Sequence, residues 1–278
     1  MEAFVTVEQI DQAASFLRCR TPYQPTIGLI LGSGLGGLAD SVAKPDVIPY
    51  TEIPHWPVST VIGHAGRLVF GELEGKSVVV MQGRTHYYEG YSMSQVTFPV
   101  RVMQRMGVQM LMVTNAAGAI HPDYNPGDVM LITDHIALIG MAGQNPLRGP
   151  NLDEFGERFP DMSRPYDHDL IALARTAARE ASITAREGIY ICLAGPSFES
   201  PADLRFLRAI GADAVGMSTV PEVIVARHGK TRVLGISGIT NKANLDGSTE
   251  TTHEEVLQAG SELGPKIERI IRSVLRQV

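Results

Sequence analysis

Polar side chains and glycines that could do chemistry gather in five short motifs. The motifs are GSGLGG (32–37), QGRTHYYEG (82–90), TNAAGAI (114–120), GPSFESP (195–201) and TNKAN (240–244). Each follows, or ends, an apolar run typical of a β-strand. Open α/β sheets bind their ligands beyond the carboxyl ends of their strands. We therefore expect the five motifs to meet at one site.

The first motif has the G-x-G-x-x-G spacing of a nucleotide loop, at Gly32, Gly34 and Gly37. A dinucleotide fold would follow it with a helix and then a strand ending in an acidic residue, about 20 residues on. Four prolines between residues 45 and 57 make such a regular βαβ unit a poor fit. Two interpretations remain. The backbone N–H groups and Ser33 hydroxyl hold a single phosphate at a helix start, or the motif is a tight turn without a ligand.

In the second motif Arg84 and His86 are two residues apart, so in extended chain their side chains lie on the same side. A guanidinium suits phosphate, and a histidine adds a donor or changes charge near neutral pH. This pair therefore favours an anion site. The alternative is that Arg84 pairs with a carboxylate such as Glu89 while His86 lies on the surface.

The fourth and fifth motifs suit a heterocyclic base. Phe198 offers an aromatic face beside Glu199, a carboxylate that can accept from ring N–H groups. Asn241 can donate and accept at once. Ser200 and Pro201 are typical of a helix start, so the alternative is that Glu199 only stabilises that helix and Phe198 lies in the core.

Other chemistries find less support. No H-E-x-x-H or paired Cys/His spacing indicates a zinc site, and no G-x-S-x-G indicates a serine hydrolase. Cys19 and Cys192 form no C-x-x-C pair, and we interpret them as buried or idle thiols. His64 and His253 are ambiguous by themselves.

The elements that must position these residues alternate along the chain. Strands are predicted at 26–31, 67–70, 77–81, 110–114, 129–133, 188–193 and 232–237, and helices at 7–17, 95–105, 169–181, 202–210 and 222–228. Alternation of this kind predicts an α/β domain with a parallel or mixed sheet. A last helix begins at the capping box Thr252–Glu255, and Pro265 should bend or split it. The irregular stretch 135–165 is either functional or a subunit contact.

Composition bounds the remaining possibilities. The 278 residues are 44% hydrophobic and 19% charged, with a net charge of −6, as in an ordinary soluble protein. The absence of a basic block argues against nucleic acid as a partner. Neither a signal peptide nor an apolar run of about 18 residues is present, so we expect no membrane partner and a cytoplasmic location.

Together the motifs resemble the trimeric purine nucleoside phosphorylases, from about residue 26 to about residue 260. They occur in order as LGSGLGGLAD, GHAGRLVFG, MQGRTHYYEGY, VTNAAGAI, GQNPLRGPN, AGPSFESPAD, VGMSTVPEVIVARH, ITNKAN and HEEVL. The resemblance implies one α/β domain over 1–278, with a central mixed, partly barrel-like sheet flanked by helices. It also implies a pentosyltransferase of purine salvage that cleaves purine nucleosides with inorganic phosphate, a co-substrate, into base and ribose 1-phosphate. No metal or organic cofactor is implied, and the assembly is a homotrimer.

The resemblance also assigns roles to individual residues. The phosphate site would use Ser33, His64, Arg84, His86, Asn115, Ala116 and Ser218. The ribose would meet Tyr88, Met217 and His253, with Phe159 supplied by a neighbouring subunit. The base would lie near Ala117, Gly118, Phe198, Glu199, Val215 and Asn241. Glu199, Asn241 and His86 would carry the catalysis.

Two positions bear on specificity. The related methylthioadenosine phosphorylases have aspartate where this chain has Asn241 and an apolar residue in place of His253. The resemblance therefore implies 6-oxopurine substrates such as inosine, guanosine and their 2′-deoxy forms. The alternatives are a methylthioadenosine or broad-specificity phosphorylase, and a sensor of purine or phosphate without catalysis.

Overall fold

The computed structural model describes residues 4–61, 63–243, 247 and 252–278 of the chain. Within them one sheet is built from β1 (Ile27–Leu31), β2 (Ala43–Pro49), β3 (Arg67–Leu73), β4 (Lys76–Gln82), β5 (Met110–Ala119), β6 (Val129–Ile136), β7 (Ala185–Cys192), β8 (Ala214–Gly216) and β9 (Arg232–Lys242). The α-helices are α1 (Val7–Arg20), α2 (Met93–Val96), α3 (Phe98–Met106), α4 (His168–Glu180), α5 (Pro201–Ala209), α6 (Val220–His228) and α7 (His253–Leu275).

The sheet is mixed and partly closed. Its strands lie in the order β2-β3-β4-β1-β5-β8-β7-β6-β9, and β5 pairs with β9 as well. Strands β5, β8, β7, β6 and β9 therefore close into a barrel, from which β1, β4, β3 and β2 extend. Strand β1 is parallel to β4 and β5, whereas β3 is antiparallel to its neighbours. The α/β class and the mixed, partly barrel-like sheet are confirmed.

The segment after β1 is not a βαβ unit, as the prolines predicted. A short 3-10 helix, Gly36–Ser41, follows the glycine motif, so the expected α-helix start is absent there. Strand β2, which was not predicted, then runs antiparallel to β3 at the sheet edge. An edge strand tolerates prolines because one row of its N–H groups has no ladder partner to lose.

Other elements differ from the sequence prediction in extent. The predicted helix 95–105 is two helices, α2 and α3, with Pro99 in the first turn of the second. Strand β8 was missed because it has three residues. Strands β5 and β9 run past their predicted ends through Ala119 and Lys242, so two of the motifs lie in strands. Helix α7 is continuous, and Pro265 does not split it.

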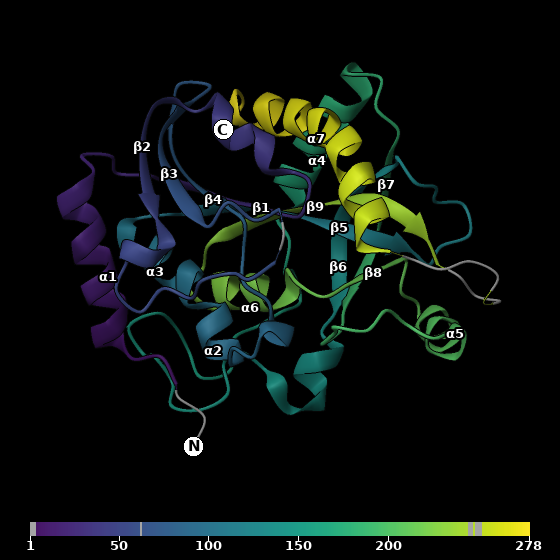
Figure 1. The fold of residues 1–278 in the computed structure, drawn as a ribbon, viewed down its shortest axis with the longest axis horizontal. Coiled ribbons are helices and arrows are strands. Elements are labelled where there is room, and N and C mark those ends of the chain that lie inside the picture. Colours follow the sequence, from purple (N-terminus) through teal and green to yellow (C-terminus); the bar gives the residue numbers. More distant parts are fainter. Residues whose placement is uncertain (1–3, 62, 244–246, 248–251) are drawn as a thin grey trace.

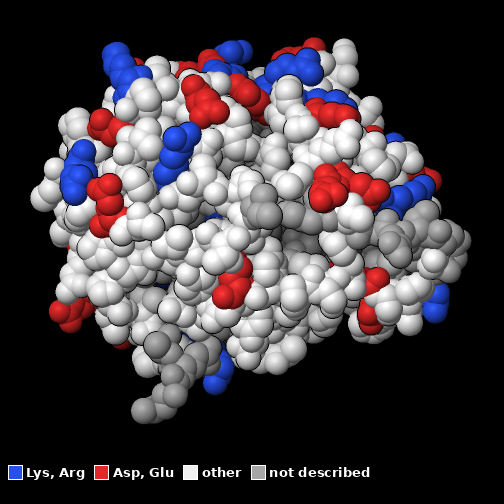
Figure 2. Space-filling model, viewed as in Figure 1, with Lys and Arg blue, Asp and Glu red and all other residues white. Residues whose placement is uncertain are grey.

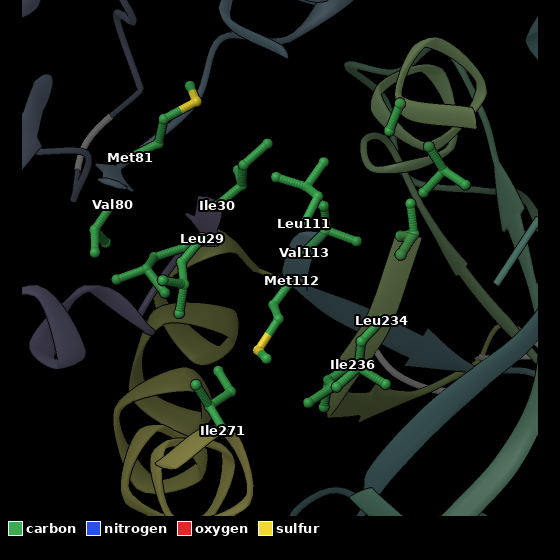
Figure 3. Packing of buried hydrophobic residues seen from close by; sticks show 14 of the residues in the cluster. Leu29, Ile30, Val80, Met81, Leu111, Met112, Val113, Leu234, Ile236 and Ile271 are labelled. Atoms are coloured by element: carbon green, nitrogen blue, oxygen red, sulfur yellow. The ribbon is translucent and has the colours of Figure 1, made fainter. Parts of the chain in front are cut away.

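Helices flank the sheet (Figure 1). Helices α4 and α7 pack on each other and on β6 and β9, while α1 packs on α3 and α3 on α6. The core between these layers is aliphatic, and Figure 3 shows side chains from β1, β4, β5, β9 and α7 meeting there. All five residues of β1 are buried. Burial of this apolar surface, at about 25 cal/mol per Å², stabilises the strands whose ends bear the motifs.

On the face in Figure 2, lysine and arginine side chains are interspersed with aspartate and glutamate. No helix in the described part of the chain is long and apolar enough to cross a bilayer. Cys19 is exposed and Cys192 is buried, and both are free thiols.

Candidate active site

One pocket of about 410 Å³ collects residues from all five motifs. Most of the predicted site residues line it: Ser33, Arg84, His86, Tyr88, Asn115, Ala116, Ala117, Gly118, Phe198, Glu199, Val215, Met217, Ser218 and Asn241. The strand ends β1, β4, β5, β8 and β9 and the loop before α5 supply them. The prediction that the motifs meet is confirmed.

The glycine motif lies at one end of this pocket. A Cβ on Gly32 would come within 2.8 Å of the Asn115 Cα, and one on Gly34 within 2.8 Å of the Gly260 Cα in α7. Gly34 also has a φ of +74°, which favours glycine. These two glycines let the loop approach β5 and α7 closely, and Ser33 between them faces the pocket.

Arg84 is the cation of this end, and its side chain is 2% exposed. Its Nη1 donates to the Thr114 carbonyl oxygen at 2.8 Å and to Ser218 Oγ at 3.1 Å. Its Nε lies 3.1 Å from a carboxylate oxygen of Glu222. The alternative pairing of Arg84 with Glu89 is wrong, because Glu89 binds His86 instead.

The loop before α6 forms another part of the pocket lining. Thr219, which is buried, has a φ of +72° and ψ of −57°, a strained conformation for a β-branched residue. Its hydroxyl accepts a hydrogen bond from Asn115 Nδ2 at 2.9 Å, which joins the loop to β5. This anchoring sets Ser218 against Arg84. Backbone strain of this kind is concentrated at functional sites.

Two histidines lie beside the arginine. The rings of His64 and His86 stack at 5.4 Å, and His86 stacks on Tyr88 at 4.8 Å. His64 Nε2 is 3.2 Å from Ser33 Oγ, and its Nδ1 is 2.7 Å from the Arg84 carbonyl oxygen. His86 is buried, with Nδ1 3.1 Å from a carboxylate oxygen of Glu89, so it is no surface histidine.

Burial and hydrogen bonds shift the charges of these groups. Burial lowers the pKa of His64 to about 4, so its ring is neutral at neutral pH. Burial by itself would raise the pKa of Glu89, but hydrogen bonds from His86 and Thr60 outweigh it and lower the pKa to about 2. Glu89 is therefore a carboxylate that orients His86.

Acid pH is expected to destabilise the fold through His64 and His135. Burial lowers the pKa of each from 6.5 to about 4. Between these values the unfolded chain binds protons that the folded chain does not, so the free energy of unfolding falls as pH falls through this window. Urea denaturation at about pH 7.5, 6 and 5 measures this loss.

The variants His64→Asn and His135→Asn should each make the loss shallower, while His55→Asn, at an exposed position, serves as the control. An unchanged pH dependence in both buried-site variants would contradict the explanation.

The other end of the pocket combines Phe198, Glu199 and Asn241. Phe198 is 45% exposed and lines the pocket, so the alternative that it lies in the core is wrong. The start of α5 is capped by Ser200 and Asp203, not by Glu199. Glu199 instead faces the pocket, where burial raises its pKa.

A β-bulge aims Asn241. Strands β5 and β9 pair Ala117 with Ile239 but Gly118 with Asn241, so Thr240 is an extra residue in β9. Bulges beside active sites re-aim side chains in this way. The Thr240 hydroxyl lies 3.0 Å from Asn241 Oδ1 and can donate to it, which leaves the Nδ2 group as the pocket-facing donor. A Cβ on residue 118 would come within 3.2 Å of that Nδ2, so glycine there makes room for the amide.

Two predicted residues, His64 and Phe159, do not line the pocket in the described part of the chain, and a third, His253, is not placed. His64 contacts it through Ser33. Phe159 is 87% exposed and lines a second hollow, of about 1020 Å³, with Met141 and Phe206. His253 begins α7, but its side chain lies outside the described residues.

Sequence reasoning missed some pocket residues. Gly32, Pro196, Gly216, Thr240, Val61 and Val256 also line it. Gly32, Pro196, Gly216, Thr240 and Val256 stand inside the quoted motifs, so their positions gave a signal. Val61 is an apolar residue outside them, and only the fold brings it to the pocket.

A buried arginine with hydroxyls at one end and an amide with a carboxylate at the other define a site for an anion beside a heterocycle. The chain belongs to the phosphorylase superfamily, whose sequence profile matches residues 26–276. Within that superfamily it is a member of the purine nucleoside phosphorylases, because it is at least 50% identical to several of them over nearly its whole length.

Relatives of this kind match over nearly the whole chain. It is 52% identical to purine nucleoside phosphorylase 1 of Bacillus subtilis over 270 residues, 97% of this chain and 98% of that protein. The crystal structure of Schistosoma mansoni purine nucleoside phosphorylase with inosine has a TM-score of 0.95 and 41% identity, covering 99% and 98% of the two chains. A crystal structure of Schistosoma mansoni purine nucleoside phosphorylase with adenosine has a TM-score of 0.95 and 42% identity, covering 99% of each chain.

Proposed function

We propose that the protein catalyses the phosphorolysis of 6-oxopurine nucleosides, inosine and guanosine, to the free base and ribose 1-phosphate, in purine salvage. The observation that carries this proposal is the pairing, in one pocket, of the Arg84 end with the Glu199 and Asn241 end. A binding protein for either ligand alone needs only one of these ends.

The anion end binds inorganic phosphate. Arg84 supplies the charge, Ser33, Ser218 and His86 supply further donors or acceptors, and His64 contacts Ser33. The backbone N–H groups at Asn115 and Ala116, on β5, complete this subsite. The ribose lies between the two ends, against Tyr88 and Met217, with His253 at its 5′-hydroxyl.

The base end binds the purine. Phe198, Ala117, Gly118 and Val215 contact its faces, while Glu199 accepts from N1–H. Asn241 donates its Nδ2–H toward N7. A 6-oxopurine has the N1–H that Glu199 needs, whereas adenine has none, and this difference favours inosine and guanosine over adenosine.

Catalysis follows from where charge develops. Breaking the N-glycosidic bond leaves positive charge on the ribose ring and negative charge on the departing purine. The phosphate anion stabilises the first and attacks the anomeric carbon. Asn241 stabilises the second at N7, and Glu199 fixes the orientation of the base. Each such interaction contributes about 2 to 4 kcal/mol to lowering the barrier.

Release of free base tests the proposal. Inosine, guanosine, adenosine and methylthioadenosine are each incubated with and without inorganic phosphate. Phosphate-dependent cleavage of the first two is the expected result. Cleavage of adenosine or methylthioadenosine at comparable rates would favour a broad-specificity phosphorylase, and binding without cleavage would favour a sensor. Dialysis against a chelator should leave the rate unchanged, because we predict no metal or organic cofactor.

We also propose that the protein is a homotrimer. Phe159, Met141 and Phe206 are apolar and 87%, 76% and 54% exposed around the second hollow. Exposed apolar side chains of this size, gathered in one place, mark interaction surfaces. Covered by a second copy, this surface lets Phe159 reach the ribose subsite of the neighbour. A cytoplasmic location stays a prediction from the sequence.

Phe159→Ala is expected to raise the KM for inosine about tenfold, because a lost aromatic anchor costs of order 1 to 2 kcal/mol. Steady-state kinetics measure the change. Val47→Ala, at a similarly exposed apolar side chain on edge strand β2, is the control and should leave the KM unchanged.

A mixing experiment tests the sharing of Phe159 directly. Subunits carrying Phe159→Ala have an intact pocket, and subunits carrying Glu199→Gln have an intact Phe159. At inosine concentrations well below the KM of the Phe159→Ala variant, mixed trimers should be more active per subunit than either variant alone. Absence of any gain after subunit exchange would contradict the shared site.

A further inference from the structure

A buried ion pair lies behind the anion subsite. Arg84 and Glu222 are 2% and 3% exposed, and the guanidinium Nε is 3.1 Å from the nearer carboxylate oxygen. The other carboxylate oxygen of Glu222 is buried without a hydrogen-bond partner among the described residues, and so is Nη2 of Arg84. The pair therefore interacts mainly as charges and not as a paired set of hydrogen bonds.

Glu222 lies behind the arginine and does not line the pocket itself, whereas Arg84 does. Glu222 stands in the first turn of α6, three residues after the strained residue Thr219. Its carboxylate consequently faces the guanidinium from inside the protein.

Among the described residues, the other groups near the pair provide no second ion-pair partner for Arg84. Burial raises the pKa of the Tyr50 hydroxyl well above its ordinary value and that of the Cys192 thiol to about 12, so both are neutral. Glu89 is a carboxylate, but it lies against His86 and Thr60. Glu222 is thus the carboxylate in contact with Arg84.

We propose that Glu222 sets the strength of anion binding at this subsite. With the subsite empty, Glu222 balances the buried guanidinium, which would otherwise be an unpaired charge out of water. With phosphate bound, the carboxylate repels the anion through a low-dielectric interior and weakens its hold. This inference rests on the proposed function, because it takes phosphate as the anion at Arg84.

The same repulsion serves the reaction. Arg84 neutralises a bound phosphate less when its own charge is shared with Glu222. The phosphate then keeps more of its negative charge for the positive ribose ring that forms in the transition state. Release of the anionic sugar phosphate is also easier from a balanced site.

The variant Glu222→Gln keeps the shape of the side chain and removes its charge. We expect it to bind inorganic phosphate about tenfold more tightly, since one like charge has gone from the interior. Its unfolding temperature without phosphate should fall, and phosphate should raise that temperature by more than in the unchanged protein. In kinetics, the KM for phosphate and the kcat should both fall.

A merely structural role predicts the opposite sign. If the variant lost packing or displaced Arg84, the KM for phosphate would rise. The increase in unfolding temperature that phosphate causes would then be smaller. Glu74→Gln is the matched control, because Glu74 also pairs with arginines, Arg272 and Arg276, but at the far end of α7. It should lower the unfolding temperature without altering the increment from phosphate.

A double variant, Arg84→Met with Glu222→Gln, removes both charges. It should unfold at a higher temperature than Glu222→Gln, and phosphate should not raise its unfolding temperature. If Glu222→Gln folds only with phosphate present, urea denaturation over a series of phosphate concentrations gives the same affinity by linkage.

The outcomes separate the inference from the function on which it rests. Equal or weaker phosphate binding by Glu222→Gln, with normal binding by the unchanged protein, overturns the role of Glu222. No increment from phosphate in the unchanged protein overturns the phosphate subsite itself.

Discussion

Replacing Glu199 with glutamine is expected to lower kcat/KM for inosine phosphorolysis by about 10²- to 10³-fold. The carboxylate lines the base end of the pocket, and there it accepts from the purine N1–H in our proposal. A glutamine amide can present its NH₂ group to that position, and two donors then face each other. Initial rates with inosine over a range of phosphate concentrations measure the loss.

A second carboxylate of the same helix start is the control for Glu199. Asp203 lies in the first turn of α5 and accepts hydrogen bonds from Ser200, outside the pocket. Asp203→Asn should lower the unfolding temperature slightly through the weakened cap and leave kcat/KM unchanged. Undiminished turnover by Glu199→Gln would remove Glu199 from the catalytic role.

The pH dependence of activity offers an independent check on Glu199. Burial raises the pKa of this carboxyl above its ordinary value. Protonation removes the acceptor for N1–H, so kcat/KM should fall on the acid side at a higher pH than an ordinary glutamate would give. The pH profile of kcat/KM for inosine measures this fall at acid pH.

Asn241→Asp is expected to change specificity, lowering kcat/KM for inosine about 10²-fold and raising the preference for adenosine. Thr240 can donate to Oδ1 at 3.0 Å, so an aspartate at this position would turn its other oxygen toward the base. That oxygen accepts from a 6-amino group but repels the negative charge developing at N7. The ratio of kcat/KM values for adenosine and inosine is the measurement.

An exposed amide serves as the control for this exchange. Asn125→Asp makes the same chemical change in the loop before β6, away from the pocket. It should leave the substrate ratio unchanged. An equal loss for both nucleosides in Asn241→Asp leaves the ratio unchanged. That outcome would contradict the contact of the amide with the base and would mean that the amide only supports the fold.

Much of the site could be predicted because its residues lie in short motifs. Arg84 with His86 and Phe198 with Glu199 are neighbours in the chain, so their chemistry is local and visible. The strands that carry them are continuous apolar runs such as β1, whose burial on both sides is typical of an interior strand. The prolines after β1 likewise excluded a dinucleotide fold correctly.

Other features depend on long-range pairing and left no local signal. Thr240 is a bulge only because β9 pairs with β5, from residues more than 100 positions away. Val61, outside the quoted motifs, reaches the pocket through packing between distant segments. Strand β8 has three residues, too few for a hydrophobic period to appear.

By itself the sequence determined which chemical groups are present and which strands and helices stand next to them in the chain. Motif spacing and apolar periodicity are properties of neighbouring residues, so they are visible without the fold. The tertiary structure alone decided the partners. It set Glu222 rather than Glu89 against Arg84, and it used two glycines to bring the Ser33 loop against β5 and α7. Ion pairs and close backbone approaches form between segments that the chain separates, and only the closed sheet brings those segments together.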